Sequence, residues 1–296
     1  MTPGKTKPVP PDRVIAAMAD RRPAVLDVIR EAKREITLSL FRCNDAEIFA
    51  ELKRAVARGV AVNVLVTSRA KGGKKKLKKL WDALQGTGAS VHAYDDPVVK
   101  YHAKYLVADD GPAVVASQNL TRKCFEKTCD ALVVTYDPDV VSGLRRLMAA
   151  DREAAAMPQD LSPRLIVGPE RARRQFTALI DQAKSSIHLI DAKLSDPDLV
   201  ERLNNRRAEG LTVEVFGSKR LGALKSHGKI MLLDDRIAVV GSLALAALSL
   251  DFRREVAIVV DDPAAVAEVR AVFRTIDAVP TAGRLAATGT VGGAVC

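Results

Sequence analysis

The sequence predicts an α/β sandwich made of two similar halves. The first observation is a repeated His-x-Lys segment, with His102 and Lys104 in one copy and His227 and Lys229 in the other, 125 positions later. The second is that helix-like and strand-like segments alternate in the same order before each copy. Such alternation is typical of α/β folds, and self-similarity at a fixed spacing indicates a duplicated architecture. We therefore expect each half to bring one histidine and one lysine to a shared place.

Each half is predicted to run helix, strand, helix, strand. The predicted ranges are 24–34, 36–41, 46–58 and 60–66 in the first half, and 171–184, 187–190, 198–208 and 211–216 in the second. The helices have apolar residues at helical spacing, and the strands are short runs of apolar and β-branched residues. The second helix of each half ends at Gly59 or Gly210, and glycine is the residue type that most often ends a helix.

Over these elements the halves align at an offset of 151 positions, which falls to 125 at the histidines. The second half therefore lacks 26 residues, roughly the equivalent of 72–97, where the first half has a predicted helix and strand. The expected organisation is a disordered leader (1–12), a first half (13–150), a linker (151–163), a second half (164–280) and a disordered tail (281–296).

Both His-x-Lys segments are predicted to lie on β-strands, in which residues two apart point to the same face. Asp109 and Asp234 follow at an odd spacing from their histidines. Each aspartate begins an Asp-Asp pair ahead of a further apolar strand, which is a hairpin-turn pattern. We therefore interpret these two aspartates as turn residues first and site residues second.

The composition indicates a basic protein that is neither secreted nor membrane-spanning. The net charge of +10 favours anionic partners such as nucleic acid, anionic lipid headgroups or small phosphates. The lysine-rich run 71–79 is either a solvated helix face or a contact for a phosphate backbone or an anionic bilayer. Neither a signal peptide nor a membrane-spanning run is predicted. The four cysteines form no C-x-x-C pair, which indicates a reducing compartment, so we expect a cytoplasmic protein.

The residue types indicate phosphoryl chemistry without a metal ion or other cofactor. One imidazole can attack phosphorus to form a phosphohistidine, while a second protonates the leaving oxygen and then activates water. Two ammonium groups can hold the non-bridging oxygens, where negative charge builds up. An acidic residue beside a histidine can fix its tautomer. Hydroxyl and amide donors at Ser117, Asn119 and Ser242 can add to the phosphate cradle.

The doubled motif resembles that of the phospholipase D superfamily, H-x-K-x4-D-x6-G-S-x-N with an acidic residue eleven positions beyond the asparagine. The two copies here are His102, Lys104, Asp109, Ser117, Asn119 and Asp130, and His227, Lys229, Asp234, Ser242, Ala244 and Glu255. The resemblance implies two α/β halves about a pseudo-twofold axis, with one active site at their interface. It also implies that His102 is the nucleophile and His227 the general acid and base. The further catalytic residues that it implies are Lys104, Lys229, Asp130 and Glu255.

The second copy departs from the motif. Ala244 stands where the motif has asparagine, which removes one phosphate donor. Losing such a donor typically costs on the order of 10²–10³ in rate. In the first copy, Ala116 replaces a glycine, which is a small change. The site is therefore expected to be slow, or to recognise its substrate differently.

The expected function is that of a phospholipase D-type phosphodiesterase, which cleaves a phospholipid headgroup through a covalent phosphohistidine by hydrolysis or by transfer to an alcohol. One alternative is a metal-independent nuclease of the same superfamily. The other is a weakly active or inactive anion-binding protein, which Ala244 keeps open. The expected partner is an anionic phosphodiester, either phospholipid or nucleic acid, and a peripheral membrane contact is compatible with the charge. The sequence does not indicate an oligomeric state.

Overall fold

The computed structural model describes residues 9–69, 74–217 and 220–277. Most of the predicted leader and the whole of the predicted tail, 281–296, lie outside the described residues, as does the start of the lysine-rich run. Helix α5 (Pro138–Arg152) extends into the first two residues of the predicted linker. The boundaries of the two halves otherwise stay a prediction.

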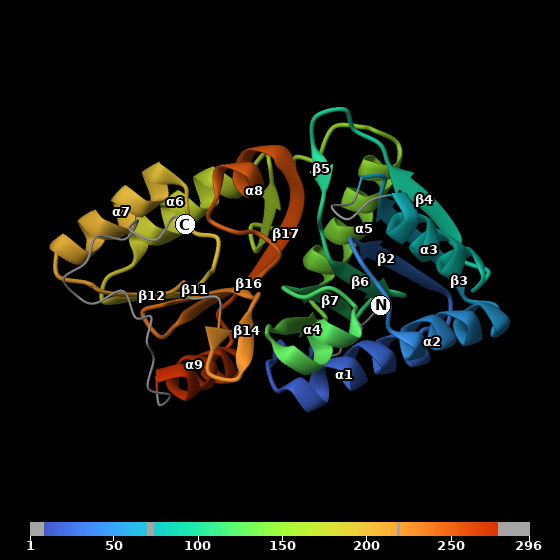
Figure 1. The fold of residues 1–296 in the computed structure, drawn as a ribbon, viewed down its shortest axis with the longest axis horizontal. Helices are drawn as coiled ribbons and strands as arrows, with labels where there is room; N and C mark the ends of the chain where they lie inside the picture. The colour runs from blue at the N-terminus through green and yellow to red at the C-terminus, as the bar shows by residue number, and fades with distance from the viewer. Residues whose placement is uncertain (1–8, 70–73, 218–219, 278–296) are drawn as a thin grey trace, which may run out of the picture.

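Two mixed β-sheets organise the chain, one from each half (Figure 1). The strands of the first sheet are β1 (Arg13–Ile15), β2 (Glu35–Leu40), β3 (Ala61–Thr67), β4 (Ser90–Tyr94), β6 (Tyr105–Ala108), β7 (Ala113–Ala116) and β9 (Leu132–Thr135). The strands along the second sheet are β10 (Leu165–Gly168), β11 (Ser186–Ile190), β12 (Thr212–Phe216), β15 (Lys229–Leu233), β16 (Ile237–Gly241) and β17 (Arg253–Val260).

The two sheets repeat the same topology. The first has the order β1-β9-β7-β6-β2-β3-β4, and the second has the order β10-β17-β16-β15-β11-β12. In each sheet the pair that follows the first helix, β2 with β3 or β11 with β12, is parallel, and the remaining shared pairs are antiparallel. Strand β4 has no counterpart among the described residues of the second half, which is shorter in sequence at this point. The predicted duplicated α/β sandwich is confirmed.

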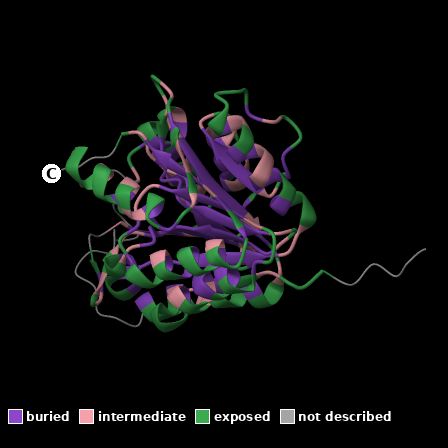
Figure 2. Cartoon of the chain, turned by 90° about the vertical axis from the view of Figure 1, so that its right-hand side faces the viewer, coloured by how far each residue is buried: buried purple, intermediate pink, exposed green. Residues whose placement is uncertain are grey.

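Helices complete the layers. They are α1 (Met18–Glu31), α2 (Ala46–Ala57), α3 (Lys74–Gln85), α4 (Arg122–Lys127), α5, α6 (Ala172–Gln182), α7 (Pro197–Ala208), α8 (Ala247–Phe252) and α9 (Pro263–Asp277). Helices α1 and α2 cover the outer face of the first sheet, and α6 and α7 cover that of the second. The inner faces share one central core with α5 and α9. Figure 2 shows the buried strands inside helices whose outer faces are exposed. None of the helices in these ranges combines the length and apolar character needed to cross a bilayer.

The helix boundaries follow from local chemistry. The Asp45 carboxylate accepts the backbone N–H groups of Glu47 and Ile48 and so caps α2. Asp196, its counterpart 151 positions later, caps α7 by accepting the N–H of Leu199. The first helix begins at Met18, six residues before the predicted start, and continues through Pro23 in its second turn.

The prediction that both His-x-Lys segments lie on β-strands is wrong except at Lys229, which is the first residue of β15. Strand β5 (Lys100–Tyr101) ends just before His102, and β6 begins just after Lys104. Strand β14 (Leu224–Ser226) likewise ends just before His227, and β15 begins at Lys229. The reason is a change of pairing partner. The strand before each histidine pairs with the other half, whereas the strand after it joins the sheet of its own half.

Candidate active site

Two short parallel strand pairs join the halves and determine which residues meet. Strand β5 pairs with the start of β17, with Tyr101 opposite Arg254. Strand β14 pairs with β8 (Thr128–Cys129), with Ser226 opposite Cys129. In each pair, the next residue after one strand is a histidine, and the next residue of the partner segment is acidic. These two residues lie beside each other because parallel strands keep their register. The two pairs are related by the same 125-position offset as the motifs.

Each histidine is therefore paired with the acidic residue of the opposite half. His102 Nδ1 forms an ion pair with a Glu255 oxygen. His227 Nδ1 lies 3.0 and 3.1 Å from the two Asp130 oxygens. Both carboxylates are fully buried, whereas the two imidazoles are 15% and 31% exposed. A carboxylate at Nδ1 favours the tautomer with the proton on that nitrogen, which leaves Nε2 of each ring free to react.

Hydroxyl groups hold the two buried carboxylates. Ser117 Oγ donates to Asp130 Oδ1 at 2.6 Å, and Thr128 Oγ1 donates to Oδ2 at 2.5 Å. In the second half Ser249 Oγ donates to Glu255. Burial alone would raise the pKa of both carboxyl groups, but their histidines and these hydroxyls outweigh it, so the pKa values of Asp130 and Glu255 are lowered. The acids therefore stay ionised and keep their histidines oriented.

Each of the two lysines folds back onto its own motif. Lys104 Nζ donates to the carbonyl oxygen of His102 at 2.6 Å, and Lys229 Nζ makes the same bond to the carbonyl of His227. Both lysines are buried. Burial lowers the pKa of Lys104 to about 7; Glu255 opposes this shift and the charge of Lys229 adds to it. Burial and Lys104 lower the pKa of His102, which favours its neutral, nucleophilic form.

We predict that kcat/KM for a soluble phosphodiester falls as the pH rises through about 7, because Lys104 then loses the charge that binds the phosphate. The direction follows from the lowered pKa: the ammonium form exists only below it. The measurement is the pH profile of kcat/KM, which reports groups of the free enzyme. Lys104→Arg keeps its charge and should lack this fall. The same fall in both proteins would assign the titration to another group.

A pair of cations that the sequence analysis did not single out follows the equivalent strands β2 and β11. These are Arg42 and Lys193, and Lys193 lies close enough for its charge to lower the pKa of Lys104. Burial, then Lys229 and Arg253, lower the pKa of Lys193 itself. The signal was present in the sequence, because the two residues are 151 positions apart, the offset of the surrounding elements.

The expected phosphate donors divide into two groups. The Ser117 hydroxyl proton is directed to Asp130, and Ser242 Oγ donates to the carbonyl of Val256 at 3.3 Å. Both serines are buried, so their geometry favours positioning the acid and the backbone over direct phosphate contact. Asn119 borders a cavity of about 830 Å³. Its side-chain amide is therefore the best placed of the three to reach a ligand in that cavity.

The motif aspartates lie away from this cluster, in turns. The Asp109 carboxylate accepts the backbone N–H groups of Lys33, Arg34 and Glu35 at 2.7–3.0 Å. Asp234 accepts those of 184, 185 and 186 in the same way. Both aspartates have a positive φ, as tight turns require. Each joins its hairpin to the connection between a helix and the following strand, which is a structural role.

A cavity of about 830 Å³ opens beside His227. Its lining is both apolar and basic, with Phe41, Phe49, Leu77 and Leu80 on the apolar side and Arg42, Lys76, Lys79, Lys123 and Lys225 on the basic side. The wall formed by α3 belongs to the segment that the second half lacks. The lysine-rich run is therefore neither a purely solvated face nor a separate patch, because two of its lysines border the cavity.

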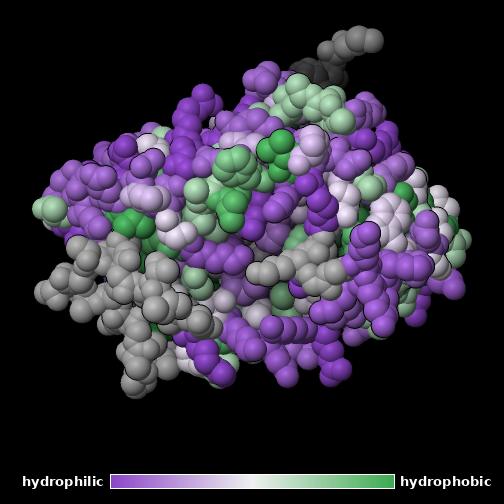
Figure 3. Space-filling view, turned by 45° about the horizontal axis from the view of Figure 1, so that its top comes forward, coloured by the Kyte–Doolittle hydropathy of each residue, from purple (hydrophilic) through white to green (hydrophobic). Residues whose placement is uncertain are grey.

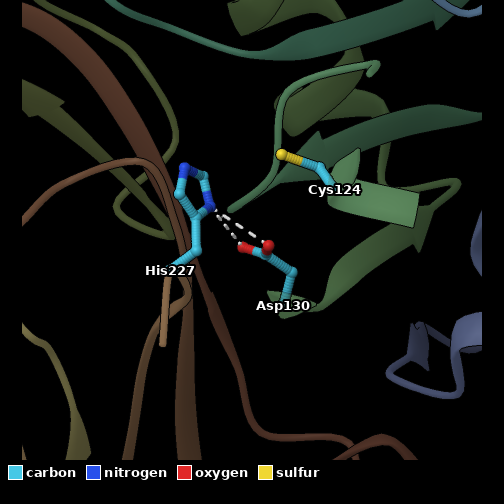
Figure 4. Close-up of side chains that lie close together, drawn as sticks. All are labelled: Cys124, Asp130 and His227. Atoms are coloured by element: carbon cyan, nitrogen blue, oxygen red, sulfur yellow. Dashed lines mark hydrogen bonds and ion pairs between the residues drawn. The ribbon is translucent and has the colours of Figure 1, made fainter. Parts of the chain in front are cut away.

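One group of side chains in the described ranges has the donor atoms for a metal ion. Cys124 Sγ, an Asp130 oxygen and a His227 ring nitrogen lie within 4.8 Å of one another. Figure 4 shows the three side chains converging from α4, the segment after β8 and the segment after β14.

Residues 25–152 and 218–276 match the protein family described as cardiolipin synthase, PLD-like domain. The chain is also similar to cardiolipin synthase A of Pseudomonas putida (strain W619), with 26% identity over 140 residues. That alignment covers 46% of this chain and 29% of the relative, so it spans less than a third of the relative's length.

Two solved structures have a similar fold. Polyphosphate kinase of Porphyromonas gingivalis superposes with a TM-score of 0.73 at 18% identity, over 90% of this chain and 46% of that one. Phosphatidylserine synthase of Haemophilus influenzae Rd KW20 superposes with a TM-score of 0.67 at 13% identity, over 89% of this chain and 86% of that one. At these identities the likeness concerns the fold alone.

Proposed function

The chain belongs to the phospholipase D superfamily, and we propose that it cleaves the headgroup phosphodiester of a phospholipid through a covalent phosphohistidine. The observation that carries the proposal is the pairing of each motif histidine with the buried acidic residue of the opposite half, beside two buried lysines. This arrangement supplies a nucleophile, an acid and two cations, as a two-step displacement at phosphorus requires.

In the first step, His102 Nε2 attacks phosphorus, and the bond from phosphorus to the leaving oxygen breaks. His227 donates its Nε2 proton to that oxygen, while Asp130 stabilises the charged imidazole. In the second step His227 removes a proton from water, or from an acceptor alcohol, whose oxygen attacks phosphorus and releases His102. Lys104 and Lys229 hold the non-bridging oxygens throughout, so negative charge develops against fixed positive charges.

The lining of the cavity supports a phospholipid over a nucleic acid. Its apolar wall includes Phe41, Phe49 and Leu80, and its basic residues lie around the same space. A phospholipid carries an anionic headgroup and a long apolar body, and this lining suits both. Nucleic-acid sites rely instead on extended basic grooves and exposed stacking residues, whereas aromatic residues make up only 4% of this chain.

An exposed apolar patch near the site supports contact with a membrane surface. Val98, Leu248 and Phe252 are 62%, 61% and 47% exposed. Figure 3 shows apolar side chains gathered over α8 and the turn before β5 on an otherwise hydrophilic face. The basic residues Lys100 and Arg253 stand opposite each other where these segments join, two residues before His102 and Glu255. Apolar side chains beside cations are typical of interfacial binding to anionic bilayers.

The test offers the purified protein mixed phospholipid vesicles and, separately, plasmid DNA, each with EDTA present. We expect release of phosphatidate, or its transfer to an added alcohol, and intact DNA. Activity should survive EDTA, because two lysines supply the positive charge. Nicked DNA with intact lipid would replace this proposal with the nuclease. Loss of all activity on chelation, restored by Mg²⁺ or Ca²⁺, would contradict the mechanism.

A further inference from the structure

The thiol beside His227 gives this histidine a second set of partners. Cys124 Sγ, an Asp130 oxygen and a His227 ring nitrogen lie within 4.8 Å of one another (Figure 4). Thiolate, carboxylate and imidazole are the three side-chain donors that bind Zn²⁺ in proteins. We propose that these residues form a zinc site, and that zinc bound there inhibits the enzyme. The inhibition rests on the proposed function, whereas the metal binding does not.

The surroundings suit a three-ligand zinc site. Cys124 and His227 both border the 830 Å³ cavity, so a water molecule can reach the fourth coordination position. Zinc–ligand bonds of about 2.0–2.3 Å place tetrahedral donors about 3.3–3.7 Å apart, so the side chains need to move by only about 1 Å. Ser117 and Thr128 hold the Asp130 oxygens, as outer partners commonly hold a metal-binding carboxylate.

The charge of the complex also suits the site. Two cations, Arg21 and Lys104, interact electrostatically with Cys124. A thiolate, a carboxylate and Zn²⁺ together carry no net charge, so the bound metal adds no repulsion toward these cations. Binding releases the thiol proton to solvent, and zinc affinity should therefore increase with pH.

The second half provides an internal comparison. The residue 125 positions after Cys124 is Ser249, whose hydroxyl donates to Glu255, the partner of His102. The two halves thus differ at this position by sulfur in place of oxygen. A neutral hydroxyl is a poor zinc ligand, whereas a thiolate is a strong one. The zinc site is therefore specific to the His227 side, and Cys124→Ser recreates an arrangement that the fold already contains.

Zinc at this site removes the acid of the mechanism. In the acid form that the mechanism requires, the His227 ring carries a proton on each nitrogen, and the Nδ1 proton is shared with Asp130. Zinc binds Nδ1 in place of this proton, which is released to solvent, and the proton on Nε2 stays. The ring is then a neutral ligand and has no imidazolium form from which to protonate the leaving group. Chelators should consequently preserve or increase activity, in agreement with a mechanism that needs no metal.

The site is tested in the full chain with two metals. With Co²⁺ we expect one ion per chain and a thiolate-to-cobalt charge-transfer band in the near ultraviolet, a readout independent of activity. With chelator-buffered Zn²⁺ we expect inhibition of hydrolysis of an aryl phosphodiester, expressed as the ratio of rates with and without zinc. Cys124→Ser should lose the band and weaken inhibition by about 100-fold or more, since losing even an outer partner of a metal typically costs 10–100-fold.

Cys43→Ser is the matched control. Cys43 borders the same cavity, and burial raises the pKa of its thiol to about 12, so it should not bind zinc at neutral pH. This variant should keep the band and the wild-type zinc sensitivity. Absence of the cobalt band in the wild type, or zinc inhibition unchanged in Cys124→Ser, would overturn the site. A protein that binds cobalt through Cys124 yet hydrolyses no diester would keep the site and refute the proposed function.

Discussion

His102→Ala should abolish turnover of a phosphodiester, lowering kcat by about 10⁴-fold or more, because no other group in the proposed mechanism can accept the phosphoryl group. The environment of His102 agrees with this role. Burial and Lys104 lower its pKa, so the ring is neutral at physiological pH, and Glu255 at Nδ1 leaves Nε2 free. The variant leaves Asp130 and His227 paired, and Glu255 keeps the hydroxyl of Ser249 as a hydrogen-bond partner, so we expect the fold to be retained.

The measurement combines steady-state rates with trapping of a labelled phosphoenzyme by denaturation at alkaline pH, where a phosphohistidine is stable. Wild type should yield one labelled histidine per chain, in the peptide that contains His102, and His102→Ala should yield none. The control is His92→Ala, since His92 lies on β4 with a hydrogen bond to Ser90 and has no place in the mechanism. Equal turnover by wild type and His102→Ala would remove His102 from the reaction.

The sequence predicted much of this architecture because duplication makes weak signals visible. A single His-x-Lys is common, but the offsets of 125 and 151 between the halves tied the motifs and elements together. The turns at Asp109 and Asp234 are local features of the chain, so residue type and spacing were enough to predict them.

The pairing of the halves could not be predicted, because it depends on contacts between residues far apart in the chain. The strands β5 and β8 have two residues each, too few for any periodicity to be detected. They pair with the other half and not with their neighbours in sequence. This pairing explains why the His-x-Lys segments are not continuous strands. It also decides which acid serves which histidine, a question that the spacing left open.

The offset could have revealed two further features. The offset of 151 relates Arg42 to Lys193, a second pair of cations, and the offset of 125 relates Cys124 to Ser249. Neither pair belongs to the motif, and a search confined to motif residues therefore passes over them. Their proximity to the site becomes visible only when the fold places α4 and α8 beside the acids.

Asp130→Asn and Glu255→Gln should impair the first step in different ways, because each acid serves the histidine of the opposite half. Asp130→Asn weakens His227 as an acid, and its defect in the first step should be large, about 10³–10⁴-fold, for an alkyl alcohol leaving group. The defect of Asp130→Asn should nearly vanish when the leaving group is p-nitrophenolate, because this group leaves without being protonated. Glu255→Gln weakens the nucleophile His102, so its defect should be similar for both leaving groups.

The measurement is the pre-steady-state rate of the first step, since His227 also activates water in the second and would otherwise limit both variants. The two amide variants serve as controls for each other, because both replace a buried carboxylate beside an imidazole. If each acid instead served the histidine of its own half, the two patterns would exchange. They would also exchange if His227 were the nucleophile, but the phosphoenzyme would then survive in His102→Ala. The two experiments together therefore separate the pairing of the residues from the assignment of their roles.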